Sequence, residues 1–169
     1  MTGHENGRAL VITSPAPLPP PDDRLRIFLA GSIDGGQAPD WQGEVITALG
    51  DCDVAIFNPR RTSWDARSKP DAADPAFRQQ VEWELAGLEQ ADVIAMYLAP
   101  SSLAPISLLE LGLHAGSTKL ILCCEDGFWR KGNVDIVAQR WNIDCVPDLA
   151  ALTQVLRAKS RCRRVRDKN

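Results

Sequence analysis

The chain has 169 residues, of which 44% are hydrophobic and 24% charged, and its net charge is −3. This length predicts one domain with a substantial core. No apolar run approaches the roughly 20 residues that a membrane-spanning helix needs. The N-terminus lacks the basic start and apolar run of a secretory signal, and the five cysteines are odd in number, without metal-type spacing. We therefore expect a soluble protein of the reducing cytoplasm, with no membrane partner.

The two ends of the chain differ from its middle. Near the start, ALVIT at 9–13 is a candidate edge strand, and the prolines of SPAPLPPPDD fix an extended connector. We expect an N-terminal extension over 1–25 and the folded domain over 26–158. The last ten residues, SRCRRVRDKN, hold five basic side chains, so we expect a disordered tail over 159–169. Because such a run is more often a solvated tail than a nucleic-acid contact, we expect no nucleic-acid partner.

From residue 26 onward, apolar runs of strand length alternate with helical patterns. The expected strands are 26–31, 53–58, 92–98, 119–124 and 143–146, and the expected helices are 39–49, 75–90, 105–115, 132–140 and a last one ending near 158. This alternation predicts a parallel sheet, and the continuously apolar strands predict helices on both of its faces. The fold class is therefore α/β, a three-layer, doubly wound, flavodoxin- or Rossmann-like fold with about five parallel strands.

In such a sheet the loops at the carboxyl ends of the strands form the ligand crevice. The four informative loops are GSIDGG (31–36), NPRRTSWD (58–65), APSSLAPIS (99–107) and EDGFWRKGN (125–133). The glycines of the first loop do not fit the dinucleotide spacing GxGxxG, so NAD binding is not supported and we expect no cofactor. They do permit backbone N–H groups to approach a ligand oxygen, although a simple turn explains them equally well.

Glu84 is the first carboxylate whose position needs an explanation. Asp74 as N-cap and Pro75 at the first position predict the start of its helix. Glu84 lies in or beside the apolar stripe of that helix, whereas Glu82 and Glu89 point away. The stripe is expected to consist of Phe77, Val81, Leu85 and Leu88. A buried carboxylate is costly unless it is hydrogen-bonded or paired with a charge, holds a proton or serves a function. The alternative is that Glu84 lies near the end of the stripe, where its carboxylate reaches solvent or an arginine.

Glu110 lies in PISLLELGLHAG (105–116), where the leucines spread around the helix while Ser107, Glu110 and His114 share one polar stripe. That stripe could be a solvent edge. However, Pro105 starts the helix just after the third expected strand, which places Glu110 little more than one turn from the ligand edge. Glu110 and His114 lack further metal ligands, so we expect no metal. The motif GxSxG is absent, which argues against a Ser-His-Asp hydrolase.

The remaining chemistry is that of carboxylates. A carboxylate can attack an anomeric carbon and form a glycosyl ester, while a second acid assists the leaving group. The residue types therefore favour a sugar-like or nucleoside-like ligand.

Five motifs occur in a recognisable order: IFLAGSIDGG, FNPRR, FRQQVEWELAGLEQADVIAMY, PISLLELGLHAG and GFWRKGNVDIV. Together they resemble the nucleoside 2-deoxyribosyltransferase superfamily, most closely its nucleoside 2-deoxyribosyltransferase-like branch of bacteria and fungi, over residues 26 to about 158. The resemblance implies an enzyme that cleaves the N-glycosidic bond of a 2′-deoxynucleoside and passes the sugar to a free nucleobase or to water.

The resemblance also implies roles for individual residues. Glu110 of the Glu-Leu-Gly motif would be the nucleophile, and Glu84, eight residues before Asp92, would bind the sugar or assist the base. Asp34 would repel a phosphate, which favours a free nucleoside. Asn133 would reach the site of the neighbouring subunit, so a homo-oligomer with shared active sites is implied. The glycine-rich loop would lie along the sugar with Gly31, Ser32, Ile33, Asp34, Gly35 and Gly36.

Two positions depart from the family pattern. Phe28 stands where relatives carry a tyrosine that orients the nucleophile. Ala104 stands where relatives carry Asp or Ser, so Ser101, Ser102 or Ser107 would have to substitute. These departures keep two alternatives open: an N-glycosidase of nucleoside 5′-monophosphates, and a non-catalytic sensor that binds a nucleoside or nucleotide.

Loop position alone suggests further pocket residues. Trp41, Asn58 and Arg60 are expected to line the base or sugar pocket, and Asp92 is a second candidate for protonating the leaving base. For Arg60 and Arg61, a surface ion pair is as good an explanation as a ligand contact.

Overall fold

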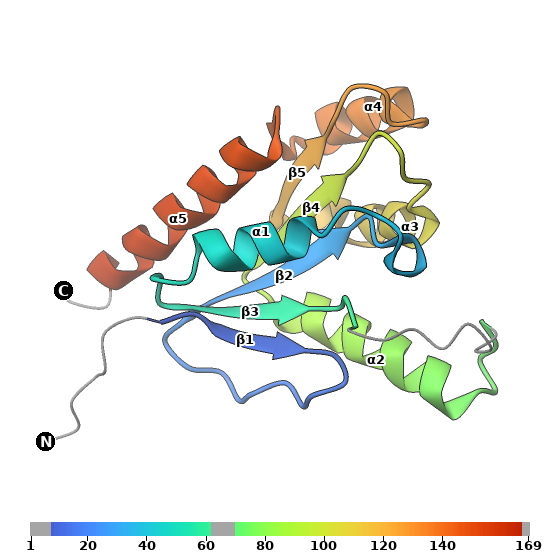
Figure 1. Cartoon of the computed structure of the whole chain (residues 1–169). Helices are drawn as coiled ribbons and strands as arrows, with labels where there is room; N and C mark the ends of the chain where they lie inside the picture. Colours follow the sequence, from blue (N-terminus) through green and yellow to red (C-terminus); the bar gives the residue numbers. More distant parts are fainter. Residues whose placement is uncertain (1–7, 62–69, 167–169) are drawn as a thin grey trace, which may run out of the picture.

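The computed structural model describes residues 8–61 and 70–166, with side chains up to 162. Within these residues the chain forms a six-stranded, all-parallel sheet between two layers of helices (Figure 1). The predicted α/β, doubly wound fold is therefore confirmed.

The sheet has the strand order β1-β3-β2-β4-β5-β6. Its strands are β1 (Leu10–Thr13), β2 (Leu25–Gly31), β3 (Val54–Asn58), β4 (Val93–Leu98), β5 (Leu120–Cys124) and β6 (Asp144–Val146). The predicted count of about five is one strand too low because β1 joins the sheet. It pairs in parallel with β3, from Leu10 opposite Ala55 to Thr13 opposite Asn58, and Ile12 enters the core. The candidate edge strand is thus real.

Two layers of helices cover the sheet. One core joins it to α1 (Trp41–Ala48) and α5 (Leu149–Arg166), and a second core joins its other face to α2 (Pro75–Gln90), α3 (Pro105–His114) and α4 (Lys131–Trp141). Figure 1 shows α1 and α5 on one side of the strands and α2 and α3 on the other. No helix in the described part of the chain is long and apolar enough to cross a membrane.

The last helix is longer than expected. We placed its end near 158, with a disordered tail from 159, but α5 continues to Arg166. Leu152 and Leu156 are fully buried and anchor the helix to the sheet, and Ser160 is buried one turn further on. Arginine and lysine also have good helix propensity, so a basic composition does not prevent the helix from continuing. Residues 167–169 lie outside the described part.

Helix α2 begins as predicted, but its buried face differs from the expected stripe. The Asp74 side chain accepts hydrogen bonds from the backbone N–H groups of Ala76 and Phe77, at 2.8 and 3.1 Å. The predicted stripe member Leu85 is exposed, and the inward face consists instead of Gln80, Trp83, Gly87 and Leu88. Successive residues lie about 100° apart around a helix axis, so the predicted buried face is wrong by about one residue. The error arises because a glutamine occupies a core position.

The order in which strands are added to the sheet reverses between β2 and β4, which are neighbours although β3 lies between them in sequence. At this point Gly31 has φ +136°, and a Cβ there would lie 2.1 Å from the carbonyl oxygen of Tyr97. Only glycine allows this approach of the two strands. Just beyond, Ala99 N–H donates to Ser32 Oγ at 3.0 Å, which joins the loops that leave β2 and β4. Ligand crevices of doubly wound folds lie at such a point.

Candidate functional site

Glu110 lies in the second turn of α3, and its side chain is only 8% exposed. The polar stripe predicted for this helix faces inward, since Ser107 is buried as well. The apolar residues Ile106, Leu109 and Leu113 are instead 58 to 60% exposed. The stripe is therefore not a solvent edge, and α3 presents its carboxylate to the interior.

Glu84 lies in the middle of α2, partly buried, as its position in the sequence led us to expect. Its Oε1 accepts a hydrogen bond of 2.6 Å from Nε2 of Gln80, one helical turn earlier. Glu82 and Glu89 are exposed, as predicted. Both α2 and α3 pack on β2, so the two carboxylates reach the same side of the sheet from separate helices.

The two carboxylates affect each other. Burial raises the pKa of Glu110 to about 8, and the negative charge of Glu84 adds to this effect. Burial also raises the pKa of Glu84, but the Gln80 hydrogen bond and the positive charge of Arg61 oppose it. Because Glu84 acts on Glu110 as a charge, Glu84 loses its proton first. The directions of these shifts therefore favour Glu110 as the protonated member of the pair and Glu84 as the ionised one.

An apolar floor explains the burial on this side of the sheet. Phe28 of β2 is fully buried, and its ring centroid lies 6.2 Å from that of Trp83. A Cβ at Gly87 would lie 2.8 Å from the Phe28 ring, so α2 approaches β2 closely at this glycine. Phe28 stands at the position where the resemblance implies a tyrosine that orients the nucleophile. The structure places it in the core under α2, where a phenylalanine needs no hydrogen-bond partner.

In the predicted sugar-binding loop after β2, the side chains of Ser32 and Asp34 are already hydrogen-bonded to backbone groups of the protein. Ser32 is fully buried, and its Oγ is the acceptor for Ala99 N–H. Asp34 is partly buried, and its Oδ1 accepts from Ala104 N–H, at 3.4 Å, at the start of α3. A carboxylate at a helix N-terminus is favourable. Gly35 is exposed with φ +63°, and it leaves its backbone open to a ligand.

Trp41 lines neither of the two hollows described below. It is 1% exposed, its Nε1 donates to Ser32 O at 2.9 Å, and its ring lies 5.4 Å from the Tyr97 ring. These contacts belong to the core under α1, on the face of the sheet opposite α2 and α3. The expectation for Trp41 is therefore corrected: a tryptophan at the start of a helix that covers the sheet packs inward.

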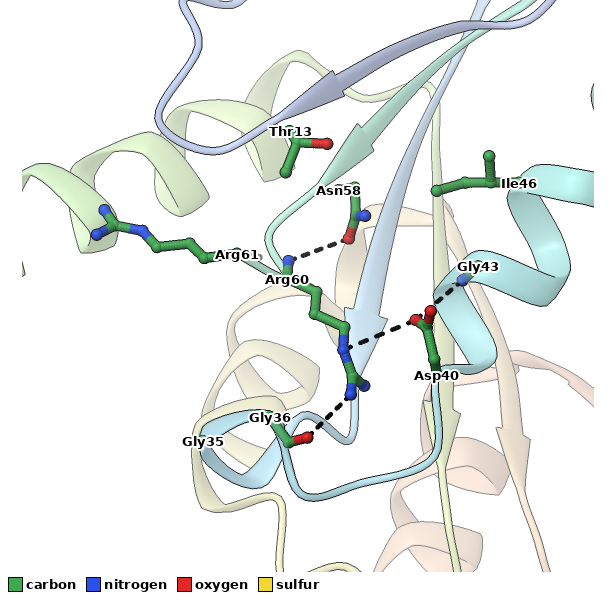
Figure 2. Close-up of a pocket in the computed structure, with 9 residues that line it drawn as sticks. All are labelled: Thr13, Gly35, Gly36, Asp40, Gly43, Ile46, Asn58, Arg60 and Arg61. Atoms are coloured by element: carbon green, nitrogen blue, oxygen red, sulfur yellow. Dashed lines mark hydrogen bonds and ion pairs between the residues drawn. The ribbon is translucent and has the colours of Figure 1, made fainter. Parts of the chain in front are cut away.

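A hollow of about 500 Å³ opens where β1, β2 and β3 end (Figure 2). Its lining consists of Thr13, Gly35, Gly36, Asp40, Gly43, Ile46, Asn58, Arg60 and Arg61. Asn58 and Arg60 both line this hollow, and their contact with a base or sugar stays a prediction. Neither Glu84 nor Glu110 belongs to this lining. Arg61 connects the two regions, because its side chain points away from Arg60 in Figure 2 and its Nε donates to Gln80, the partner of Glu84.

Arg60 holds the loop that forms one wall of the hollow. Its guanidinium donates to the carbonyl oxygens of Gly36, Ala38 and Pro39 at 2.9 to 3.1 Å. An ion pair to Asp40 has Nε and Oδ1 3.7 Å apart. Arg60 is therefore neither a loose surface ion pair nor a free ligand-binding cation. Arg60 fixes this wall. Trp64, in the loop at 58–65, lies outside the described residues.

Ser102 lies in the loop between β4 and α3, whereas Asn133 lies on α4. Ser102 is 2% exposed, and its buried Oγ has no hydrogen-bond partner among the residues that the structure describes. Such a hydroxyl is available to a ligand or a water. Asn133 is exposed on α4 and lines a second hollow, of about 330 Å³, between α3 and α4.

Asp92 lies away from the carboxyl ends of the strands. It directly precedes β4, at the amino ends of the strands, whereas the crevice lies at their carboxyl ends. Its carboxylate pairs with Arg26, with Nη2 and Oδ1 2.9 Å apart, and accepts from the Arg26 backbone N–H at 2.9 Å. The sequence suggested Asp92 from its position beside a strand, but the length of β4 separates it from the loops at the carboxyl ends of the strands.

Within the described residues, no three His, Cys, Asp or Glu side chains gather in a way that could hold a metal ion. The pair of Glu110 and His114 therefore has no third ligand there.

Sequence reasoning overlooked Gln80 and Ser14. Gln80 is buried at 7% exposure and contacts Glu84, Arg61, Pro59 and Ser14. One signal was present: Gln80 precedes Glu84 by four residues, the spacing at which helical side chains meet. No local signal pointed to Ser14, which reaches Gln80 across 66 positions of sequence.

Comparison with protein families gives one match. The model of the family described as nucleoside 2-deoxyribosyltransferase like matches residues 24–128, more than half of the chain. A search of curated proteins finds no match. The matched stretch contains both carboxylates and the loops after β2, β3 and β4.

Proposed function

The chain belongs to the nucleoside 2-deoxyribosyltransferase-like family, and from this we propose that it cleaves the N-glycosidic bond of 2′-deoxynucleosides and transfers the sugar to another nucleobase or to water. One observation carries the proposal: Glu110 is buried with a raised pKa, and the charge of Glu84, which comes from a second helix, contributes to that rise. Retaining transfer of a glycosyl group needs such a pair, one carboxylate to attack and one acid to assist departure.

In the first half of the proposed reaction, the proton of the pair moves from Glu110 to Glu84 when the nucleoside binds. An ionised oxygen of Glu110 then attacks C1′ and forms an ester bond. The bond between C1′ and the base nitrogen breaks, its electron pair stays on the nitrogen, and Glu84 gives that nitrogen the proton.

The second half reverses these steps with a new acceptor. Glu84, now a carboxylate, takes a proton from the incoming base or water, whose nitrogen or oxygen attacks C1′. The ester bond breaks and its electron pair returns to Glu110. The pair again holds one proton, so the cycle requires no metal or cofactor.

A free nucleoside is the preferred substrate in this proposal. The only charged residue of the loop at 31–36 is Asp34, and its carboxylate lies at the start of α3. The guanidinium of Arg60 is already bonded to three loop carbonyls. A 5′-phosphate would therefore meet a negative charge in the loop that resemblance assigns to the sugar.

A homo-oligomer forms part of the proposal. Residues of α3 and of the segments beside it expose a group of large apolar side chains, which we call the α3 apolar face: Leu103, Ile106, Leu109, Leu113 and Trp129. Trp129 Nε1 donates to Leu103 O at 2.9 Å, which joins the two segments. Exposed apolar groups of this kind mark association surfaces. A second copy of the chain is the proposed occupant, since Asn133 beside this face is the residue that resemblance assigns to the neighbouring site.

An exchange assay tests the function. The protein is incubated with deoxyadenosine, deoxyinosine or thymidine together with a second free base, and products are separated by chromatography. We expect exchanged nucleoside or free base with wild type and at least a hundredfold less with Glu110→Ala. Binding of nucleosides without turnover across a broad panel would instead identify a sensor. Equal turnover by both proteins would remove Glu110 from the mechanism.

A further inference from the structure

The N-terminal segment before the family match makes contacts beside the candidate site. Strand β1 pairs with β3, and the pairing continues beyond it, with Ser14 N–H donating to Asn58 O at 3.1 Å. Two residues further, Ala16 O accepts from Trp83 Nε1 at 2.7 Å. The matched stretch starts only at residue 24. This segment is therefore outside the family pattern, yet it packs on the helix that carries Glu84.

Gln80 is the point at which the segment meets the site. Its Oε1 accepts from Ser14 Oγ at 2.5 Å and also from Arg61 Nε. Its Nε2 donates to Pro59 O at 3.2 Å and to Glu84 Oε1 at 2.6 Å. An amide offers two donor hydrogens and an acceptor oxygen with two lone pairs, so all of its capacity is used.

These partners fix the orientation of the amide. If the Gln80 side chain were flipped, its NH₂ group would face the N–H donor of Arg61. Its oxygen would face the carbonyl of Pro59 and the carboxylate of Glu84, both of which only accept. These three donor-donor or acceptor-acceptor contacts in a buried place would be costly. The Arg61 guanidinium, which only donates, and the Pro59 carbonyl, which only accepts, thus keep the amide N–H directed at Glu84, and the Ser14 hydroxyl adds a second donor to the amide oxygen.

The bond to Gln80 also distinguishes the two oxygens of Glu84. Oε1 accepts from the amide, which leaves Oε2 as the oxygen that carries a proton when the carboxyl is neutral. The same bond favours the ionised form, so it limits the rise in the pKa of Glu84 that burial causes. Arg61, after β3, and Glu110, on α3, are the other charged groups that act on Glu84 or respond to it.

We propose that Gln80 is the positioning residue of Glu84 and that Ser14 and Arg61 hold Gln80 in place, so the N-terminal segment is a working part of the site. This inference rests on the proposed function for the role of Glu84. It adds a segment of the chain, and a residue on α2, to the machinery of that reaction. The segment is therefore more than an edge strand that closes the sheet.

The test compares three variants of the full chain with wild type. Gln80→Met keeps the length of the side chain and removes its hydrogen bonds. Ser14→Ala removes only one hydroxyl. Ser160→Ala is the matched control, because Ser160 is also a buried serine whose hydroxyl is bonded, to Arg157 O at 2.8 Å, on the far face of the sheet.

Carboxyl-carbon NMR measures the titration midpoint of Glu84 directly. We expect the Glu84 midpoint to rise by about one pH unit in Gln80→Met, the effect of losing one hydrogen bond to a charged group. Ser14→Ala should move the midpoint in the same direction by less, and Ser160→Ala should leave it unchanged. In the exchange assay, kcat should fall about tenfold in Gln80→Met, with KM nearly unchanged.

An unchanged Glu84 midpoint in both Gln80→Met and Ser14→Ala would overturn the inference. So would a wild-type kcat in Gln80→Met. The titration does not need turnover, and it therefore separates the two proposals. A wild-type protein that forms neither exchanged nucleoside nor free base contradicts the function, while the midpoints still decide whether Gln80 and Ser14 position Glu84. If Gln80→Met does not fold, Ser14→Ala decides alone.

Discussion

Glu84 and Glu110 come from two different helices, and the charge of the first raises the pKa of the second. Together with burial, this brings the pKa of Glu110 to about 8. A carboxyl that keeps its proton near neutral pH is suited to reactions that move one proton between two groups. The consequences of this relationship can be measured in activity and in stability.

The activity should depend on pH through the pair. The proposed reaction needs one proton on the pair, so kcat/KM should fall as the pH rises through about 8. It should fall again in acid, where both carboxyls are protonated. In Glu84→Gln the charge that contributes to the Glu110 pKa is absent, so the titration of Glu110 should move to lower pH. A profile that is flat from pH 6 to 10, or an upward shift in Glu84→Gln, would contradict this prediction.

The titration of Glu110 should also change the stability of the fold with pH, and the direction of this change can be predicted. The folded state raises the pKa of Glu110 above its ordinary value of 4.5, so it binds the proton more tightly than the unfolded chain. The contribution of Glu110 to stability is therefore highest below about pH 4.5 and is lost as the pH rises through about 8. Glu110→Gln removes this loss, and at pH 9 it should be more stable than wild type by roughly 2 to 5 kcal/mol.

Thermal unfolding at pH 5 and pH 9 checks this prediction. The gain in Tm of Glu110→Gln over wild type should be larger at pH 9 than at pH 5. The exposed Glu82→Gln on α2 is the control and should show no such difference. An equal gain at both pH values would mean that Glu110 titrates normally.

Part of this site could be predicted from the sequence. Glu110 was found because a helix after a strand of a parallel sheet presents its first turns to the crevice, a rule that depends only on element order. Asp74 and Pro75 fixed the start of α2, so the inward direction of Glu84 survived a phase error of one residue. Local rules and topology were sufficient for these residues.

Other residues could not be placed in this way. Trp41 and Asp92 lie near family motifs, but their side chains are held by a core contact and by Arg26. The hydrogen bond of Ser14 to Gln80 joins residues 66 positions apart, and it depends on the pairing of β1 with β3. Such long-range pairings have no signature in local composition. The same holds for the three loop carbonyls that bind Arg60.

Arg60→Lys should loosen the wall of the hollow. A lysine keeps the charge but cannot donate to three carbonyl oxygens in the plane of a guanidinium. We expect a rise in KM for the nucleoside of about tenfold and a loss of stability of about 1 to 2 kcal/mol. Arg78→Lys, an exposed arginine on α2, is the matched control. Steady-state kinetics and urea unfolding measure both effects, and a KM equal to that of the control would show that Arg60 does not support the substrate pocket.

The α3 apolar face predicts the behaviour of two charged variants. Leu109→Glu and Leu113→Glu place a charge on side chains that are 60% exposed in the single chain, so the fold itself should tolerate them. If a second copy covers this face, each change buries an unpaired charge and should shift the protein to monomers. Light scattering after gel filtration measures the mass. An oligomer that persists in both variants would move the interface to another surface.

The proposed covalent intermediate provides the most direct test of the whole account. Wild-type protein is mixed with a 2′-deoxynucleoside, quenched in acid within the first turnovers, digested and analysed by mass spectrometry. The account predicts that the peptide containing Glu110 gains one deoxyribosyl group, bound as an ester to that side chain, and that Glu110→Gln gains none. An active protein that carries the sugar on another residue, or a Glu110→Gln variant that still exchanges bases at the wild-type rate, would contradict it.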